Sequence, residues 1–276
     1  MSDESTLAFI GGGNMARALI GGLLERGWHA GAISVGDPDS HQRSELVRLF
    51  PGVSVEADNA VATRDRSTWI LAVKPQQLRD VVATLMANSR TRPSLVISVA
   101  AGIPTDAIRY WLGGSVPVVR SMPNRPALLG AGVTGLFAGA DVSSCARDRA
   151  EGILRAVGAT VWVRDESQID AVTAVSGSGP AYFFLLIELL ESAAIAEGLD
   201  PETARTLATE TAYGASLMAR RMQDSAATLR EQVTSRGGTT EAALAVLRDA
   251  DLARTFSKAV HAARIRSAEL ASQYGT

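Results

Sequence analysis

The stretch Leu7–Ala16, LAFIGGGNMA, decides the fold of this 276-residue chain. Four apolar residues typical of a buried strand lead into a run of glycines, and a helical pattern follows. Gly11 allows a tight turn, Gly13 lets the backbone approach a pyrophosphate, and Ala16 packs the helix closely on the strand. The alternative is an ordinary glycine turn. The strand before and the helix after favour a dinucleotide site, whose predicted contacts are Gly11, Gly13, Asn14 and Met15.

Short β-branched runs alternate with helical stretches from the start of the chain to about Val163. Such alternation predicts a mostly parallel sheet with helices on both faces, which is a Rossmann-type doubly wound α/β fold. The expected strands are Leu7–Gly11, Ile33–Gly36, Trp69–Val73, Leu95–Val99, Val116–Val119 and Val133–Phe137, and the expected helices are Met15–Arg26, Gln76–Met86 and Thr105–Leu112.

The pattern changes after Asp165, where apolar residues recur at helical spacing and no strand signal remains. We predict a dinucleotide-binding domain over residues 1–165 and an all-α domain for substrate binding and dimerisation over residues 166–276. Gly198 reads as a helix C-cap, and Asp200-Pro201 reads as the start of the next helix. These helices are apolar over broad faces, so we expect burial against a second copy in a homodimer. The expected helices are Ile169–Val175, Ala181–Glu197, Pro201–Met222, Leu229–Val233, Thr240–Leu247 and Leu252–Leu270.

Composition narrows the class of protein. The formal charge of −2 gives no reason to expect nucleic acid or an anionic membrane as a partner. The polar start Met1–Thr6 lacks a signal-peptide pattern, and the longest apolar run, Ala181–Ile187, is far shorter than the ~20 residues that span a bilayer. Cys145 is the single cysteine, which fits a reducing compartment and makes the cytoplasm the expected location. The three histidines share no metal-ligand spacing, so no metal is expected.

Further candidate cofactor contacts follow the predicted strands, because strand carboxyl ends face the ligand crevice of an open α/β sheet. Asp37, 21 residues past Ala16, would bind the ribose 2′-hydroxyl of NADH and repel the 2′-phosphate of NADPH. His41 and Arg43 could still accommodate NADPH, and a plain surface turn is the other interpretation, so cofactor preference stays open. A solvated lysine and a simple turn are the alternatives for Lys74 and Asn124. The remaining candidates are Val73, Lys74, Pro75, Ala100, Gly102 and Asn124, whose amide offers a donor and an acceptor.

Two glycine clusters in the helical half point to a substrate pocket. Ser176–Tyr182 (SGSGPAY) and Ser235–Thr240 (SRGGTT) each interrupt a helical pattern and restart a helix. Free amides at such helix starts hold a carboxylate well. Glycine loops between helices are common, but two of them in one small domain beside a dinucleotide fold favour a pocket. The predicted substrate contacts are Ser176, Ser178, Gly237, Gly238, Thr239 and Thr240.

At these residues the chain resembles the pyrroline-5-carboxylate reductase family along nearly its whole length. The resemblance implies reduction of 1-pyrroline-5-carboxylate to L-proline, the last step of proline biosynthesis, by NADPH or NADH. It also implies a helical domain that interleaves with its mate, and further assembly of dimers into rings such as a decamer. The motifs that carry it, in the family's order, are Gly11–Met15, Val73–Gln76, Ser98–Gly102, Met122–Asn124, Ala174–Tyr182 and Gly237–Thr240.

The resemblance implies a catalytic role for Thr240, whose hydroxyl would contact the imine nitrogen while the amides of Gly237, Gly238 and Thr239 hold the carboxylate. A carbon–nitrogen double bond accepts hydride once its nitrogen is protonated or hydrogen-bonded, so alignment and one donor suffice. A 3-hydroxyacid dehydrogenase would need a lysine in the helical half, and only Lys258 is available there, away from both clusters. A non-catalytic nucleotide sensor is the rival of another class, and the intact Gly-Gly-Thr-Thr cluster argues against it.

Three positions depart from the family pattern. Arg236 stands where the family usually has proline, and Arg125 where it usually has threonine. Asp37 stands where NADPH users usually have a small or hydroxyl-bearing residue. The arginines add charge near the expected rim of the pocket, which leaves the fine substrate geometry open, and Asp37 leaves the cofactor preference open.

Overall fold

The computed structural model describes residues 6–114 and 116–274 and divides into two compact units. Unit 1 comprises residues 1–178 together with 263–276, and unit 2 comprises residues 179–262. The last strand among the described residues is β8 (Gly158–Trp162), so the switch to helices alone falls where the sequence pattern changes. The contacts between residues, however, keep the segment up to Ser178 in unit 1. The functional boundary at residue 165 stays a prediction.

A buried ion pair holds the segment just past residue 165 to unit 1. Arg120 is only 4% exposed and donates from Nη1 to Oε1 of Glu166 at 3.0 Å. The same carboxylate accepts from the backbone N–H of Thr105 at 2.7 Å and from its hydroxyl at 2.8 Å. Glu166 therefore joins three elements of unit 1 through one carboxylate.

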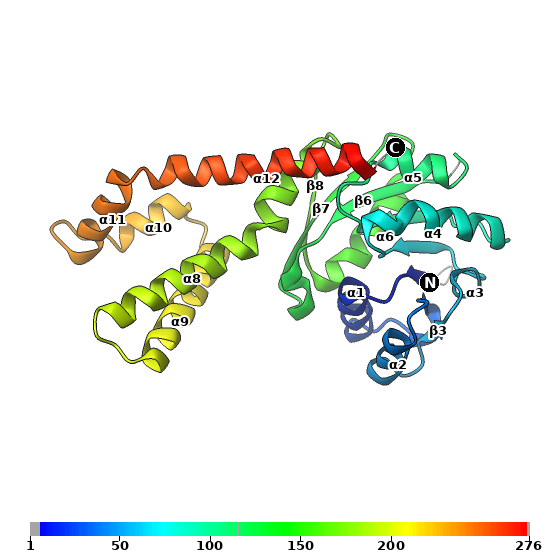
Figure 1. Ribbon diagram of the computed structural model, residues 1–276, viewed down its shortest axis with the longest axis horizontal. Coiled ribbons are helices and arrows are strands. Elements are labelled where there is room, and N and C mark those ends of the chain that lie inside the picture. The colour runs from blue at the N-terminus through cyan, green and yellow to red at the C-terminus, as the bar shows by residue number, and fades with distance from the viewer. Residues whose placement is uncertain (1–5, 115, 275–276) are drawn as a thin grey trace. The chain divides into compact units, whose positions relative to one another are not determined.

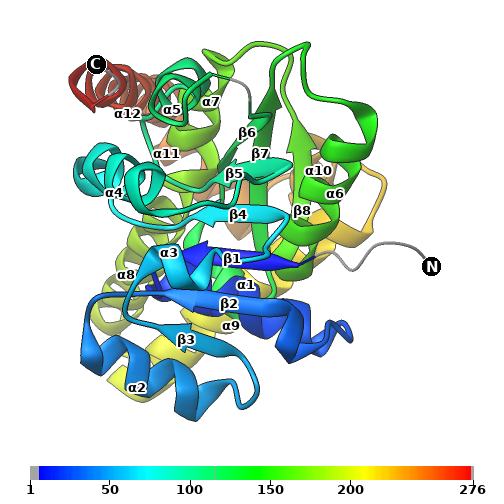
Figure 2. The ribbon, with the colours of Figure 1, turned by 90° about the vertical axis from the view of Figure 1, so that its right-hand side faces the viewer.

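Unit 1 is built on one eight-stranded sheet with the order β3-β2-β1-β4-β5-β6-β7-β8 (Figure 2). Neighbouring strands are parallel except β6 and β7, which pair antiparallel. Chain order reverses at β1, which has β2 on one side and β4 on the other, and such a switch point is where open α/β sheets bind ligands. The doubly wound fold is therefore confirmed. The strands are β1 Leu7–Ile10, β2 Ile33–Gly36, β3 Ser54–Glu56, β4 Thr68–Leu71, β5 Leu95–Ser98, β6 Val118–Met122, β7 Gly132–Ala138 and β8 Gly158–Trp162.

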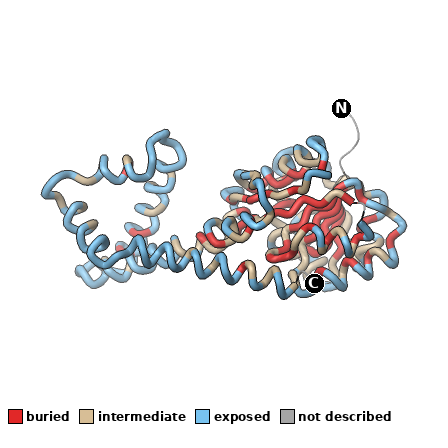
Figure 3. The backbone as a smooth tube through the Cα atoms, turned by 90° about the horizontal axis from the view of Figure 1, so that it is seen from above, coloured by how far each residue is buried: buried red, intermediate tan, exposed pale blue. Residues whose placement is uncertain are grey.

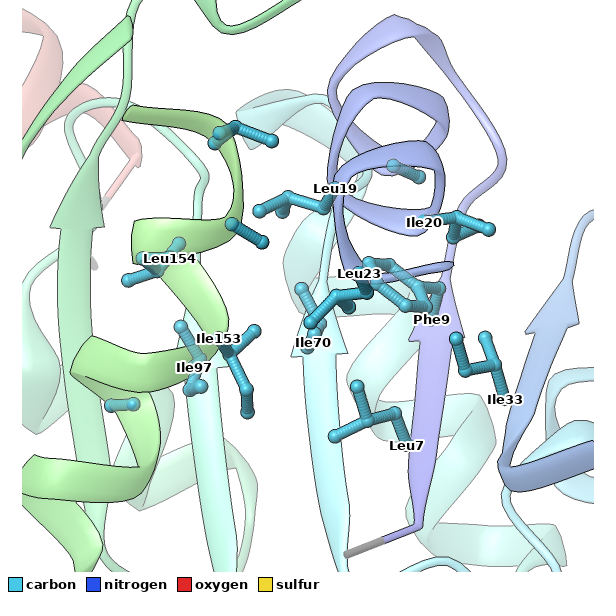
Figure 4. Packing of buried hydrophobic residues seen from close by; sticks show 14 of the residues in the cluster. Leu7, Phe9, Leu19, Ile20, Leu23, Ile33, Ile70, Ile97, Ile153 and Leu154 are labelled. Carbon is cyan, nitrogen blue, oxygen red and sulfur yellow. The ribbon is translucent and has the colours of Figure 1, made fainter. Parts of the chain in front are cut away.

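Both faces of the sheet are buried, because alternate residues of each strand point to opposite sides. Leu7 and Phe9 of β1 pack in one apolar cluster with Leu23 of α1, as Figure 4 shows. Ala8 and Ile10 pack in the cluster on the other face. Each fully buried side chain of this size contributes about 1.5–3 kcal/mol. The helices of unit 1 are α1 Asn14–Glu25, α2 Ser40–Leu49, α3 Asn59–Ala62, α4 Pro75–Asn88, α5 Thr105–Trp111, α6 Ser144–Leu154 and α7 Gln168–Val172, with short 3₁₀ turns at Ala30–Ala32, Arg125–Leu129 and Arg155–Val157.

Several elements of unit 1 differ from the expectation. The sequence pattern did not predict α2 or β3. The helix α2 buries only Leu46 and the strand β3 has three half-buried residues, so neither carries a strong apolar pattern. The strand expected at Val116–Val119 is β6, shifted toward the C-terminus to Val118–Met122. Tertiary packing, which a local pattern does not contain, sets these positions.

The side chain of Glu151 ties α6 to β8. Its carboxylate accepts from the Trp162 indole N–H at 3.0 Å and from the Thr160 hydroxyl at 2.9 Å, and it pairs with Arg155 at 2.7 Å. The hydrogen bonds from Trp162 and Thr160, followed by the charge of Arg155, lower the pKa of Glu151 below its ordinary value of 4.5. A lowered pKa means that the folded state favours the ionised carboxylate.

We therefore expect Glu151→Gln to destabilise unit 1 at neutral pH and much less in acid. The stabilisation from a carboxylate with a lowered pKa is fully present above the pKa of the unfolded chain and is lost as pH falls through the folded value. Loss of hydrogen bonds to a charged group should cost about 1–2 kcal/mol at pH 7. Denaturant unfolding followed by tryptophan fluorescence tests this, because all four tryptophans lie in unit 1. An equal difference between the two proteins at pH 7 and at pH values well below 4.5 would contradict the assignment.

Unit 2 is all helix, and its capping confirms the sequence interpretation. The Asp200 side chain accepts from the backbone N–H groups of Glu202 and Thr203, with Pro201 at the first helical position. Gly198 has a φ of +97° and ends the preceding helix. The helices are α8 Gly179–Ala196, α9 Pro201–Arg221, α10 Ala226–Gln232, α11 Thr239–Asp249 and α12 Leu252–Tyr274, which Figure 1 draws as one unbroken helix from unit 2 into the C-terminal piece of unit 1.

Apolar side chains of unit 2 lie largely on its surface. Figure 3 shows almost all of unit 2 as exposed, in contrast to the buried sheet of unit 1. The stretch Gln168–Ala196 is long and apolar enough to cross a membrane by length and composition alone, although one such helix is weak evidence for a span. Contiguous exposed apolar side chains are typical of surfaces that bind another protein or a membrane. The largest exposed apolar side chains of α8 are Phe183, Phe184, Leu185, Leu186, Leu189, Leu190 and Ile195.

Candidate functional site

The glycine turn between β1 and α1 is shaped for a ligand phosphate. Gly11 has a φ of +98°, and a Cβ there would lie 2.8 Å from the carbonyl oxygen of Ala72. A Cβ on Gly13 would meet nothing within 4 Å, so the backbone at Gly13 is open to an approaching group. Gly13 is also the N-cap of α1 and supplies no side-chain cap, which leaves the first amides of the helix, at Asn14 and Met15, available to an anion. A dinucleotide pyrophosphate fits this turn.

Asp37 directly follows β2 and reaches the glycine turn. Its Oδ2 accepts from the backbone N–H of Gly12 at 2.8 Å, and its Oδ1 accepts from the backbone N–H of Asp39 at 2.9 Å. Arg43 donates from Nη1 to the backbone carbonyls of Asp37 and Pro38 at 2.9 and 2.8 Å. The carboxylate thus lies beside the turn, and a guanidinium from α2 contacts the backbone of the loop that carries it. The acidic side chain of Asp37 and the cationic side chain of Arg43 therefore lie close together near the glycine turn.

The other candidate cofactor residues follow neighbouring strands of the same sheet. Lys74 is exposed and is the N-cap of α4, with Pro75 at the first helical position and Val73 just before it. Ala100 is buried after β5, and its N–H donates to the Ser98 hydroxyl at 3.3 Å. Since β1, β4 and β5 are adjacent and parallel, their carboxyl ends lie at one edge of the sheet.

Gly102 connects the β5 edge to the end of the chain. It has a φ of +75°, and a Cβ there would lie 3.4 Å from the backbone nitrogen of Ala271 and 3.5 Å from Leu270. The C-terminal part of α12 therefore packs on the loop that follows β5. It is anchored there by Ser267, whose hydroxyl donates to Asp170 at 2.7 Å.

Asn124 lies in the loop after β6 and has both ends of its side-chain amide bonded to the protein. Its Oδ1 accepts from the backbone N–H of Val133 at 2.9 Å, and its Nδ2 donates to the backbone carbonyl of Ser176 at 3.0 Å. The residue is 8% exposed. The amide that was expected to face the cofactor thus joins the loop after β6 to the serine cluster.

The serine cluster is not the open turn that the sequence pattern indicated. Residues Thr173–Gly177 form a π-helix between α7 and α8, and the Ser178 N–H donates to the Thr173 carbonyl at 2.8 Å. The Ser178 amide is therefore occupied, which corrects the expectation of free amides at this point. The Ser176 hydroxyl donates to the Val172 carbonyl at 2.9 Å, so its oxygen is left to accept a hydrogen bond. The Ser178 side chain is half-buried.

The second glycine cluster lies in unit 2 and is described by itself. Gly237 has a φ of +72°, Gly238 is the N-cap of α11, and Thr239 and Thr240 occupy its first turn. The N-cap has no side-chain cap bond, but the Gly238 N–H donates to the Ser235 carbonyl at 3.0 Å, which corrects the expectation that this amide is free. Thr239 is exposed and Thr240 half-buried.

A carboxylate already contacts this turn. Glu241 Oε2 accepts from the backbone N–H of Gly237 at 2.7 Å. Sequence reasoning missed this contact, although the signal was present. Glu241 stands three residues after the N-cap Gly238, where a glutamate commonly reaches back to the amides before its own helix. The turn therefore suits a carboxylate oxygen.

The chain matches two family models, one in each half. Residues 6–102 match the model described as NADP oxidoreductase coenzyme F420-dependent, and residues 166–270 match the model described as pyrroline-5-carboxylate reductase dimerisation. The pyrroline-5-carboxylate reductase of Pseudomonas aeruginosa is 46% identical over 269 residues, which cover 98% of each chain.

Solved structures give the same result over nearly the whole chain. The pyrroline-5-carboxylate reductase of Coxiella burnetii is similar with a TM-score of 0.91 at 42% identity, covering 97% of this chain and 99% of that one. The pyrroline carboxylate reductase of Plasmodium falciparum, solved with NADP bound, is similar with a TM-score of 0.83 at 25% identity, covering 96% and 98% of the two chains.

Proposed function

The chain belongs to the pyrroline-5-carboxylate reductase family, and from this premise we propose how its own residues reduce 1-pyrroline-5-carboxylate to L-proline. The observation that carries the proposal is the turn from Gly237 to Thr240. One amide of this turn already contacts a carboxylate oxygen at 2.7 Å, and a threonine hydroxyl follows on the first turn of the same helix. A substrate with a carboxylate beside a ring nitrogen presents those two groups together.

In this assignment the residues of the chain bind and align the substrate. The turn Gly237–Thr239 holds the carboxylate, which takes the place of the Glu241 side chain at the Gly237 amide and meets the Thr239 amide, while the Gly238 amide stays bonded to the Ser235 carbonyl. The Thr240 hydroxyl hydrogen-bonds the imine nitrogen and draws electron density from the adjacent carbon. Ser176 and Ser178 line the pocket. The reduced nicotinamide, when bound, supplies the hydride for that carbon. Alignment of this kind lowers the barrier without a strong base.

The enzyme is an oxidoreductase that uses a nicotinamide dinucleotide, and we assign the dinucleotide to the edge of the sheet in unit 1. The phosphates are held at Gly11, Gly13, Asn14 and Met15 by the open backbone of the glycine turn. Asp37 is assigned to the adenosine ribose. Val73, Lys74, Pro75, Ala100 and Gly102 complete the crevice from the neighbouring strands.

A spectrophotometric assay tests the reaction. Purified protein should oxidise NADPH or NADH only when 1-pyrroline-5-carboxylate is added, and L-proline should accumulate in equal amount. A 3-hydroxy acid with the oxidised cofactor is the control for the rival dehydrogenase activity. Turnover of the hydroxy acid, or binding of NADPH without turnover of either substrate, would overturn the proposed reaction.

Cofactor preference depends on Asp37. If its carboxylate lies at the ribose, NADH should be accepted well, and Asp37→Ser should raise the ratio of kcat/KM for NADPH to that for NADH by about tenfold or more, because a like-charge contact with the 2′-phosphate is relieved. Arg43, which contacts the backbone of the same loop, reduces the effect by screening. The measurement is kcat/KM with both cofactors in both proteins. An unchanged ratio means that the Asp37 carboxylate only bonds the backbone of Gly12 and Asp39.

The helical half carries a dimerisation domain, so the protein is an oligomer. We assign the exposed apolar side chains of α8 to the surface between two copies, and a ring of dimers such as a decamer to the complete assembly. We assign the enzyme to the cytoplasm, where its single cysteine stays reduced.

A further inference from the structure

We propose that Asn124 is a positioning residue for the substrate pocket, not a cofactor ligand, and that it acts by holding the Ser176 carbonyl. The proposal rests on the function assigned above for Ser176. The Ser176 carbonyl has no backbone donor four residues further along the chain, because residue 180 is proline.

In an α-helix the carbonyl of Ser176 would accept from the N–H of residue 180, four positions on. Residue 180 is proline, which has no N–H and whose ring displaces the carbonyl four residues earlier. Ser176 is half-buried, and a backbone carbonyl shielded from water without a donor is costly, so a partner from elsewhere stabilises it. Asn124 supplies it, with Nδ2 3.0 Å from the Ser176 carbonyl oxygen.

The other end of the same amide fixes where Asn124 lies. Oδ1 accepts from the backbone N–H of Val133 in β7 at 2.9 Å, so the side chain is tied to the rigid sheet. The residue is 8% exposed, and each end of its amide makes a hydrogen bond to the protein backbone. The amide therefore bridges the sheet and the π-helical segment.

Met122 makes a second contact between the same two motifs. A Cβ added to Gly177 would lie 2.7 Å from the Met122 methyl carbon, so the end of the Met122 side chain packs against Gly177. Met122 thus contacts Gly177, and Asn124 contacts Ser176. The Met-Pro-Asn motif therefore packs against the Ser-Gly-Ser motif and holds the π-helix in one conformation. Such π-helical segments often occur at functional sites.

Asn124→Asp is the sharpest test, because aspartate keeps an acceptor for Val133 and replaces only the donor to Ser176. We expect kcat/KM for 1-pyrroline-5-carboxylate to fall about 10- to 100-fold through misplacement of Ser176. The Kd for NADPH, followed by quenching of the unit 1 tryptophans, should stay within about twofold, since no cofactor contact is lost. A loss of NADPH affinity as large as the loss of kcat/KM would make Asn124 a cofactor ligand and overturn the proposal.

The double variant Asn124→Asp with Pro180→Ala provides the rescue. Alanine restores an N–H at position 180, which can serve the Ser176 carbonyl, so the cost of Asn124→Asp should shrink when both are changed. Strictly additive effects would contradict the link through Pro180. Asn124→Ala also leaves the Val133 N–H without its acceptor, so its loss of kcat/KM should be larger than that of Asn124→Asp. A second variant keeps the test valid if one of the two fails to fold.

Hydrogen exchange separates this proposal from the proposed reaction. Exchange of the Ser178 amide, which donates within the π-helix, should be faster in Asn124→Asp, while exchange of the Val133 amide should be retained. This readout needs no turnover. Absence of reductase activity in the wild-type protein would contradict the proposed function. An unchanged exchange rate of the Ser178 amide in Asn124→Asp would contradict the proposed role of Asn124.

Discussion

Replacement of Thr240 by alanine is expected to lower kcat by about 10²–10³, because it removes a hydrogen bond that strengthens as hydride reaches the imine carbon. The hydroxyl lies on the first turn of α11, and its loss leaves the amides of Gly237 and Gly238 in place. Affinity for NADPH should therefore be almost unchanged. Steady-state kinetics with 1-pyrroline-5-carboxylate, together with a cofactor binding measurement, check both parts.

The chain offers matched controls for this experiment. Thr240→Ser keeps the hydroxyl and should retain most of the activity. Thr239→Ala removes a hydroxyl from the neighbouring position, where only the backbone amide has an assigned role, and it should stay close to wild type. If Thr239→Ala and Thr240→Ala lose equal activity, the effect comes from the helix start and not from the Thr240 hydroxyl.

Introduction of a charge into the exposed apolar surface of α8 should abolish both assembly and activity. Phe184 is 62% exposed, and in an oligomer that covers α8 a glutamate there would be buried without a partner. Obligate interfaces bury large apolar areas, so the cost falls on folding of unit 2 as well as on association. We expect Phe184→Glu to be monomeric or aggregated and inactive. Light scattering and activity on the same sample measure this.

Val47 of α2 provides the control for that variant. It is 56% exposed and apolar, but it lies in unit 1, away from the matched dimerisation segment. Val47→Glu should keep the mass and the activity of the wild type. A stable and active monomer of Phe184→Glu at micromolar concentration would contradict the requirement for a dimer.

Elements with strong local signals could be predicted from the sequence. The glycines at 11 and 13 fixed the first turn because their backbone demands are specific, and the cap at Asp200 was set by a side chain that bonds its own helix. The antiparallel pairing of β6 with β7 carried no such signal, because strand direction depends on the connection and on the space left by the neighbouring strands.

The positions of the candidate site residues carry a sequence signal, whereas some of their contacts do not. Asp37, Asn124 and the two glycine clusters stay predictions of the site, and the partners of Asp37 and Asn124 include residues far away in the chain. Asn124 offered a donor and an acceptor from the start, and only its burial beside Val133 and Ser176 determined what they bind. Pro180 was read as the start of a helix, although it also removes the donor four residues after Ser176.

The division of unit 1 into two pieces has a consequence for synthesis on the ribosome. The nucleotide-binding sheet emerges early, but the segment after residue 262 that packs on Gly102 and bonds Asp170 emerges only after all of unit 2. Unit 2 spans residues 179–262, which take about 4–17 s at the usual 5–20 residues per second. For that time the nascent nucleotide fold lacks its last covering helix. Unit 1 is thus completed only after the helices of unit 2, with the exposed apolar side chains of α8, have been synthesised.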